Sequence, residues 1–228
     1  MNNGEMLIKP IAHIHCGYKE KFGIPRQSGL VDKVEAKIIF VPEYRNPDAL
    51  RGLDGYSHLW LLWQFSKAVR SEWSPTVRPP RLGGNMRMGV FATRSPYRPN
   101  PIGLSSVKLI SIELDTPKGP VLTVSGADIL DGTPIYDIKP YLAYTDSHAD
   151  ALSGFALTNE APKVEVVFAD SACKKLDESL KAEIIAILAE DPRPGYQDDP
   201  GRIYTFKYAD FEVSFKSENG VITVTDII

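Results

Sequence analysis

Residues 102–129, with the sequence IGLSSVKLISIELDTPKGPVLTVSGADI, predict two strands joined by a tight turn. Apolar residues recur on both sides of Thr116–Gly119, and the proline and glycine of that segment are typical of a hairpin turn. Working outward, similar patterns predict further strands at 6–15, 34–41, 57–65, 88–93 and 133–141. In 57–65 the periodicity is ambiguous, and the short length favours a buried strand. Because no substantial helix is predicted before residue 145, the sequence indicates a closed antiparallel barrel or a sandwich, not a doubly wound α/β fold.

The sequence changes character after Tyr144. Residues 146–160 are polar and rich in small side chains, as is typical of a linker. Beyond them the patterns predict a strand at 163–170, a helix at 171–191 and three strands in a meander at 202–227. The helix has Ser171 as a candidate cap and apolar residues at helical spacing, namely Leu176, Leu180, Ile184, Ile187 and Leu188. We expect a mainly β protein: a β domain at 1–145, a linker at 146–160 and a small α+β domain at 161–228.

Composition gives further expectations. The chain has 228 residues, of which 43% are hydrophobic and 24% charged, as in ordinary soluble globular proteins. The longest apolar stretch, at 59–65, is far too short to span a bilayer, and no signal-peptide pattern is visible. Cys16 and Cys173 lie far apart, without metal-ligand or redox spacing. We therefore expect a cytoplasmic, reduced protein without a membrane segment.

Charge is distributed unevenly along the chain. Residues 70–110 contain seven basic residues against one acidic residue, whereas 145–201 contain 12 acidic residues against five basic ones. The basic residues are mostly arginines, which suit bidentate contact with phosphate or carboxylate. They fall largely in 78–103, where prolines stiffen the chain and glycines allow close backbone approach. This segment predicts a site for a ligand that carries phosphate or carboxylate; a solvated loop is the alternative.

Motifs of several enzyme classes are absent from the sequence. Neither a dinucleotide-binding G-x-G-x-x-G nor a phosphate-binding P-loop is present. His13 and His15 share a strand face, but acidic or cysteine partners for a metal cannot be placed beside them, so we expect no metal. No serine or cysteine nucleophile has a recognisable base, which disfavours a hydrolase. From these residues alone, an RNA-binding module without catalysis, an interaction module and an enzyme all remain open.

Several long and unusual phrases resemble one protein family. They are YKEKFGIPRQSGL (18–30), YSHLW (56–60), VRPPRLGGN (77–85), GVFATRSPYRPNPIGLS (89–105) and DGTPIYDIKPY (131–141). In this order they are similar to the TsaA-like, TrmO-type tRNA methyltransferases, and AEDPRPGYQ (189–197) resembles the start of that family's C-terminal extension. The resemblance implies an antiparallel β-barrel catalytic domain that works as a homodimer. It also implies transfer of a methyl group from S-adenosylmethionine to N6 of the threonylcarbamoylated adenosine beside the tRNA anticodon.

The resemblance also implies site residues. The cofactor-binding set is Pro25, Arg26, Gln27, His58, Leu59, Arg94, Leu104, Asp131, Gly132, Thr133 and Pro134. The basic segment would then hold the anticodon stem-loop of tRNA, through Arg78, Arg81, Arg87, Arg98 and Lys139. Two of these assignments have structural alternatives, since His58 can be a core histidine and Asp131–Gly132 a simple turn.

Methylation of an adenine amine also needs a proton acceptor, because the amine's lone pair is delocalised into the ring. We expect Asp137 or Tyr141 to serve, with Asp131 as a further possibility. Alternation along the strand places Asp137, Lys139 and Tyr141 on one face. A structural ion pair on that face is the alternative.

Overall fold

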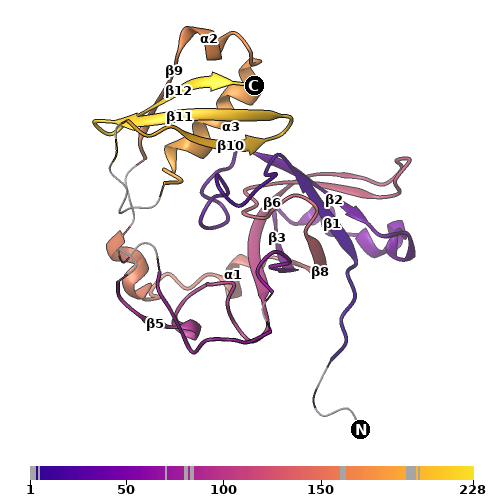
Figure 1. Cartoon of the computed structure of the whole chain (residues 1–228). Helices are drawn as coiled ribbons and strands as arrows, with labels where there is room; N and C mark the ends of the chain where they lie inside the picture. The colour runs from indigo at the N-terminus through magenta and orange to yellow at the C-terminus, as the bar shows by residue number, and fades with distance from the viewer. Residues whose placement is uncertain are drawn as a thin grey trace.

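The computed structural model describes residues 4, 6–69, 71–79, 82, 85–159, 163–193, 199 and 201–228. Figure 1 shows a barrel domain and, above it in orange and yellow, a C-terminal domain built on a sheet. The chain is mainly β, as the sequence predicts. Among the described residues, no helix has the length and apolar character needed to cross a membrane.

Six strands close into an antiparallel barrel in the order β1-β2-β7-β6-β3-β8, which confirms the barrel over the sandwich. Their bounds are β1 Ala12–Cys16, β2 Glu35–Phe40, β3 His58–Gln64, β6 Ile102–Glu113, β7 Val121–Ser125 and β8 Pro134–Pro140. The shorter elements of this domain are η1 Pro42–Tyr44, η2 Pro47–Leu50, η3 Leu53–Gly55, β4 Thr76–Val77, β5 Met88–Gly89, η5 Val90–Ala92, α1 Ala143–Asp146 and η6 Gly154–Asn159.

Alternation explains why β3 forms a strand. Leu59, Leu61 and Trp63 are buried in the barrel core, while the residues between them are less buried. Trp63 pairs with Gly103 on β6, and a Cβ atom on Gly103 would lie only 2.3 Å from the Trp63 ring. Glycine at this position therefore allows the indole to lie directly on the backbone of β6.

Two predicted strands of the barrel domain are shorter than expected. β1 begins at Ala12 and not at residue 6, because Pro10 has no N–H and the last hydrogen bond on that side runs from the Ile11 N–H to the Ile135 carbonyl, at 2.8 Å. In 88–93 only Met88–Gly89 is strand, and the chain then turns into η5, with the Thr93 N–H donating to the Val90 carbonyl.

The C-terminal domain has a sheet in the order β10-β11-β12-β9, in which β9 runs parallel to β12. Its elements are β9 Glu165–Phe168, α2 Asp170–Cys173, α3 Glu178–Ala189, β10 Tyr204–Tyr208, β11 Phe211–Glu218 and β12 Val221–Ile227. The expected helix at 171–191 is thus two helices, and the proposal of Ser171 as its cap is wrong because Ser171 lies inside α2. Asp177 caps α3 instead, since its carboxylate accepts from the Leu180 N–H at 2.8 Å.

The loop between β1 and β2 packs mainly against the C-terminal domain. Tyr18, Val31 and Val34 are buried in the same apolar cluster as the sheet and α3, and Phe22 packs against that cluster. The barrel has its own core of residues from its strands. Residues 17–34 therefore connect two strands of the barrel, while several of their apolar side chains pack in the core of the C-terminal domain (Figure 1).

Candidate functional site

A cavity of about 770 Å³ lies where β3 and β6 meet the loops that follow β1 and β5. We call it the first cavity. Its apolar wall is made by Trp63 and Phe65, whose rings meet edge to face with centroids 4.3 Å apart. Of the residues predicted to bind the cofactor, Pro25, Arg26, Gln27, Arg94, Leu104 and Thr133 line it.

Asp128 places a partly buried carboxylate in the wall of the first cavity. The Trp63 Nε1–H donates to Ser105 Oγ at 2.9 Å, and the Ser105 hydroxyl donates to Asp128 Oδ1 at 2.5 Å. Loss of water on burial raises the pKa of Asp128, although the Ser105 hydrogen bond and the nearby Arg94 charge partly oppose this. A carboxylate kept in a cavity under these conditions is suited to a ligand that brings positive charge or hydrogen-bond donors.

Sequence reasoning missed Asp128. The signal available was a single acidic residue directly after the apolar strand at 121–125, within SGADIL. Its burial depends on Ser105, which lies 23 residues away in the sequence. Gln64 and Ser28, which also line the first cavity, were missed as well.

Arg94 lies between the first cavity and a second one. The second cavity has about 740 Å³ and shares with the first a wall made by Arg26, Gln27, Thr93, Arg94, Pro96 and Tyr97. Arg94 Nη1 donates to Gln27 Oε1, which joins the 93–98 loop to the β1–β2 loop. Arg98 lines the first cavity and donates to the carbonyls of Thr93 and Ser95 at 3.1 and 3.4 Å, so it also holds the loop in shape.

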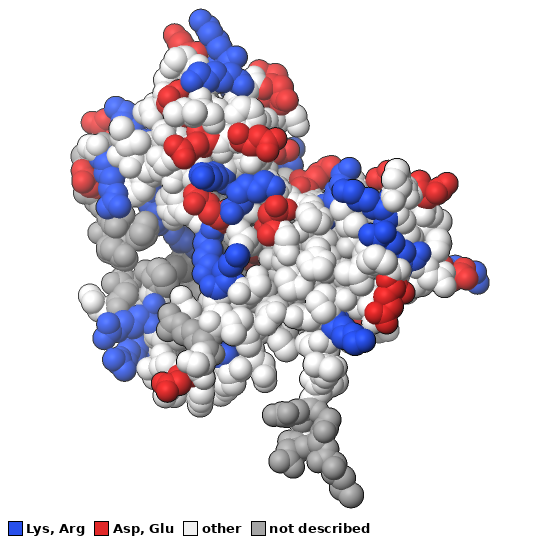
Figure 2. Space-filling view, turned by 45° about the vertical axis from the view of Figure 1, so that its right-hand side comes forward, with Lys and Arg blue, Asp and Glu red and all other residues white. Residues whose placement is uncertain are grey.

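The second cavity is basic. Arg78 and Arg87 line it together with Arg26 and Arg94. Of the residues predicted to bind nucleic acid, Arg78 and Arg87 lie here, and Arg81 lies outside the described residues. Figure 2 shows Lys and Arg side chains bordering the recess between the two domains, whereas the C-terminal domain at the top carries both signs of charge intermixed.

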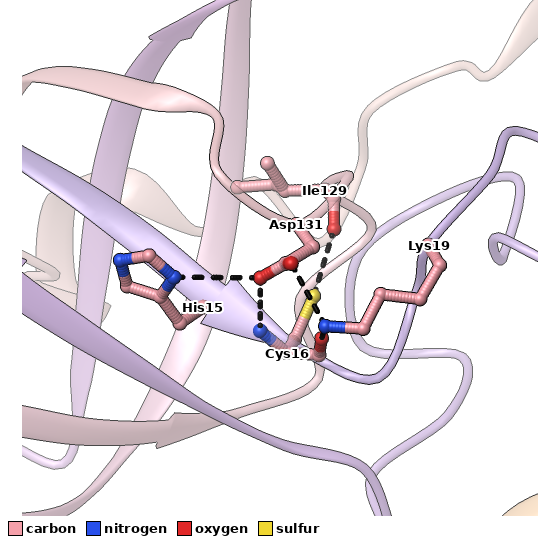
Figure 3. A network of polar contacts seen from close by, with 5 residues as sticks. All are labelled: His15, Cys16, Lys19, Ile129 and Asp131. Carbon is pink, nitrogen blue, oxygen red and sulfur yellow. Dashed lines mark hydrogen bonds and ion pairs between the residues drawn. The ribbon is translucent and has the colours of Figure 1, made fainter. Parts of the chain in front are cut away.

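Asp131 lies outside the described lining of both cavities and takes part in a separate polar network (Figure 3). Its carboxylate accepts from the Cys16 N–H at 3.0 Å and from Lys19 Nζ at 2.8 Å, and His15 Nδ1 lies 3.5 Å from it. Burial alone raises the pKa of Asp131, but the hydrogen bonds and charge of Lys19 and the Cys16 N–H outweigh it and lower that pKa. The Cys16 thiol donates to the Ile129 carbonyl at 3.3 Å, and burial raises its pKa to about 11. The network ties β1 to the 129–134 turn.

The neighbours of Asp131 serve the same turn. Gly132 has φ +75°, which favours glycine, and its N–H donates to the Ile14 carbonyl at 2.8 Å. Pro134 pairs with His13 in the barrel ladder. Asp131, Gly132 and Pro134 lie outside the described lining of the two cavities, and Thr133 is the member of this motif that reaches the first cavity.

His58 and Leu59 lie at the other end of β3 from Trp63 and Gln64. Leu59 is fully buried in the barrel core, and His58 is exposed, with its Nδ1 2.9 Å from Ser57 Oγ. Neither belongs to the part of the cavity lining that the structure describes.

Asp137 and Lys139 form an ion pair at 2.9 Å on β8, outside the described cavity walls. The Tyr141 ring packs against Trp60, with centroids 5.4 Å apart, and Trp60 lines the first cavity. The Tyr141 side chain therefore lies behind Trp60, which separates it from the described cavity lining. Within the described parts of the chain, no three His, Cys, Asp or Glu side chains gather as a metal site would require.

Comparison with known proteins gives the family. The model of the tRNA-methyltransferase O N-terminal domain matches residues 13–147, and that of the TrmO C-terminal domain matches 161–228. The chain belongs to the TrmO family. It is 42% identical over 214 residues to the tRNA (adenine(37)-N6)-methyltransferase of Escherichia coli (strain K12), covering 90% of this chain and 91% of that protein.

Two further TrmO relatives agree with this assignment. The tRNA (adenine(37)-N6)-methyltransferase of Eikenella corrodens is 47% identical over 174 residues, which cover 76% of this chain and 97% of that protein. A crystal structure of TrmO from Pseudomonas aeruginosa superposes with a TM-score of 0.80 at 34% identity, covering 98% of this chain and 99% of that one. The likeness thus extends over both domains.

Proposed function

We propose that this TrmO-family protein methylates N6 of adenine 37 in tRNA with S-adenosylmethionine as methyl donor. The observation that carries the proposal is the pair of adjoining cavities, one containing a partly buried carboxylate and the other lined by arginines. Methyl transfer needs donor and acceptor in line, and most of the rate can come from that alignment. Two cavities that share the wall around Arg94 suit this requirement.

The first cavity fits S-adenosylmethionine. Its volume of about 770 Å³ is within the range of cofactor pockets, and Trp63 and Phe65 offer an apolar wall to an adenine ring. The cofactor, when bound, supplies a methyl group on a positively charged sulfur. The Asp128 carboxylate faces a cation favourably, and the Arg94 guanidinium can hold a carboxylate. The residues present therefore match a ligand that carries both signs of charge.

The second cavity would hold the target nucleotide. Arg78 and Arg87 offer guanidinium groups to phosphates and to the acidic substituent on the modified adenosine. Arg98 and Lys139 extend the proposed RNA surface, and Arg81 belongs to the same proposal from sequence.

Four groups are proposed as proton acceptors. Asp137, Tyr141 and Asp131 are the acceptors expected from the sequence, and Asp128 is added because, of the four, it lines the first cavity. A carboxylate with a raised pKa accepts a proton more readily than an ordinary one. Single substitutions Asp128→Asn, Asp131→Asn, Asp137→Asn and Tyr141→Phe, assayed for turnover under saturating substrates, distinguish them.

Other features are also proposed from the resemblance. We propose a homodimer, supported by the exposed apolar side chains Phe91 and Leu104, which are 72% and 56% exposed beside the cavities. Sedimentation at micromolar protein tests it. We further propose a cytoplasmic location, where tRNA is modified, and retain His58, Leu59, Asp131, Gly132 and Pro134 as proposed cofactor residues. The domain limits 1–145, 146–160 and 161–228 likewise remain proposals.

The function is tested by transfer of a labelled methyl group to tRNA from a strain that lacks this gene, followed by nucleoside analysis. The expected result is a label in the N6-methylated form of the modified adenosine. Label in another nucleoside would contradict the proposed target, and binding of tRNA without any transfer would favour the non-catalytic RNA-binding module.

A further inference from the structure

The β1–β2 loop contributes to the first cavity but is packed in the C-terminal domain. Phe22 lies parallel to Phe215, with ring centroids 6.2 Å apart and an interplanar angle of 7°, and it meets Phe206 edge to face. Three residues further along, Pro25, Arg26 and Gln27 form cavity wall. The position of that wall therefore depends on a core supplied by residues near the other end of the chain.

The packing between the loop and β10 is close. A Cβ atom on Gly17 would lie 2.5 Å from the Tyr208 ring, and one on Gly23, at φ +92°, would lie 2.7 Å from the Phe206 ring. The Ala209 N–H donates to the Gly17 carbonyl at 2.8 Å. Contacts this tight leave the loop little freedom to shift along the sheet.

Arg26 continues this anchoring at the cavity itself. Its Nη2 donates to the carbonyls of Asp191 and Arg193, both at 3.1 Å, in the segment that follows α3. Asp191 has φ +43°, and its carboxylate accepts from Arg193 Nε and Nη2, each at 2.8 Å. This pairing fixes the turn whose carbonyls receive Arg26.

The far end of the loop is fixed to the barrel. The Gly29 N–H donates to the Gly126 carbonyl at 2.9 Å, and Ser28 Oγ accepts from the Ser106 N–H at 3.2 Å. Residues 25–27 thus span from an anchor on the C-terminal domain to an anchor on β6 and the end of β7. Both anchors must hold for the wall to face Asp128 and Arg94.

We infer that the C-terminal domain positions the 25–27 wall of the first cavity, with Arg26 acting as a positioning residue through the Asp191 and Arg193 carbonyls. The inference rests on the proposed function, in that the ligand of this cavity is S-adenosylmethionine. It gives the acidic C-terminal domain a role in cofactor affinity without any contact to cofactor or RNA.

The test measures S-adenosylmethionine binding to the full chain by calorimetry. Asp191→Asn removes the charge that holds Arg193 but keeps a side chain that tolerates positive φ. Arg26→Lys replaces the guanidinium, whose Nη2 donates to both carbonyls, by the ammonium group of a shorter side chain. The matched control is Asp226→Asn, which breaks a comparable ion pair of the same domain, to Lys175 at 2.8 Å, away from the loop. Hydrogen exchange of residues 21–28 and the Tm are measured for each variant.

The expected result is a dissociation constant about tenfold higher for both Asp191→Asn and Arg26→Lys, with faster exchange in 21–28. Asp226→Asn should lower the Tm and leave affinity unchanged. Wild-type affinity in Asp191→Asn overturns the inference, and if Arg26→Lys alone weakens binding, Arg26 contacts the ligand directly. Equal weakening by Asp226→Asn also overturns it. Failure of the wild type to bind the cofactor overturns the proposed function itself.

Discussion

Replacing Asp128 by asparagine should raise the free energy of unfolding and weaken the binding of the cofactor. The change keeps shape and lets Ser105 still donate, but it removes the carboxylate charge. Burial raises the pKa of Asp128 despite its hydrogen bonds, so the fold favours the protonated form, which asparagine mimics. For the ligand, one charge-assisted hydrogen bond contributes about 1.5–3 kcal/mol, which corresponds to a dissociation constant about 10- to 150-fold higher.

The stability effect has a defined dependence on pH. Between the ordinary value of 3.8 and the raised folded value, native Asp128 binds more protons than the unfolded chain does. Wild-type stability should therefore fall as the pH rises through this range, and Asp128→Asn should lack that component. Urea unfolding at several pH values and calorimetry with S-adenosylmethionine measure both effects, with Asp115→Asn in an exposed turn as the control. Unchanged affinity in Asp128→Asn would refute the placement of this carboxylate against the cofactor.

Three further predictions concern the architecture of the site. Asp131→Asn should lower the free energy of unfolding by about 1 kcal/mol at pH 7, a modest loss because the partners of Asp131 are partly exposed. Since the pKa of Asp131 is lowered in the folded protein, this difference from wild type should shrink as the pH falls below 3.8. Urea unfolding at pH 7 and pH 3 checks both statements. Gly103→Ala should destabilise the fold by about 1–3 kcal/mol, because its methyl would meet the Trp63 ring, and thermal unfolding that matches wild type would contradict this. Arg94→Lys should lower kcat/KM for tRNA about tenfold, because lysine offers one ammonium group in place of the planar guanidinium that lines both cavities, whereas an unchanged value would exclude Arg94 from the reaction.

The sequence pattern predicted the strands because alternating burial is a local property, whereas their closure into a barrel and not a sandwich was implied by the family resemblance. β2 shows this, since Ala36, Ile38 and Phe40 face the core at every second position. The N-terminus of α3 was mispredicted within the same kind of local pattern. Ser171 and Asp177 are both good caps, and the choice depends on the break after α2, which periodicity does not reveal.

The site was predicted only in part because its distant contacts are not encoded locally. The structure brings Arg94 and residues 25–27, which the motif phrases assign to the cofactor, together on one cavity. The orientation of Asp131 depends on Lys19, which is 112 residues away, and the burial of Asp128 depends on Ser105. Neither the Lys19–Asp131 contact nor the Ser105–Asp128 contact can be predicted from the spacing of nearby residues.

A crystal structure with bound S-adenosylhomocysteine, the demethylated form of the cofactor, tests the proposed site most directly. The ligand should lie in the first cavity between residues 25–27 and Arg94, with a hydrogen-bond donor within about 3 Å of the Asp128 carboxylate. Density for the ligand against Asp131 or His58, without contact to Asp128, would contradict the site described above.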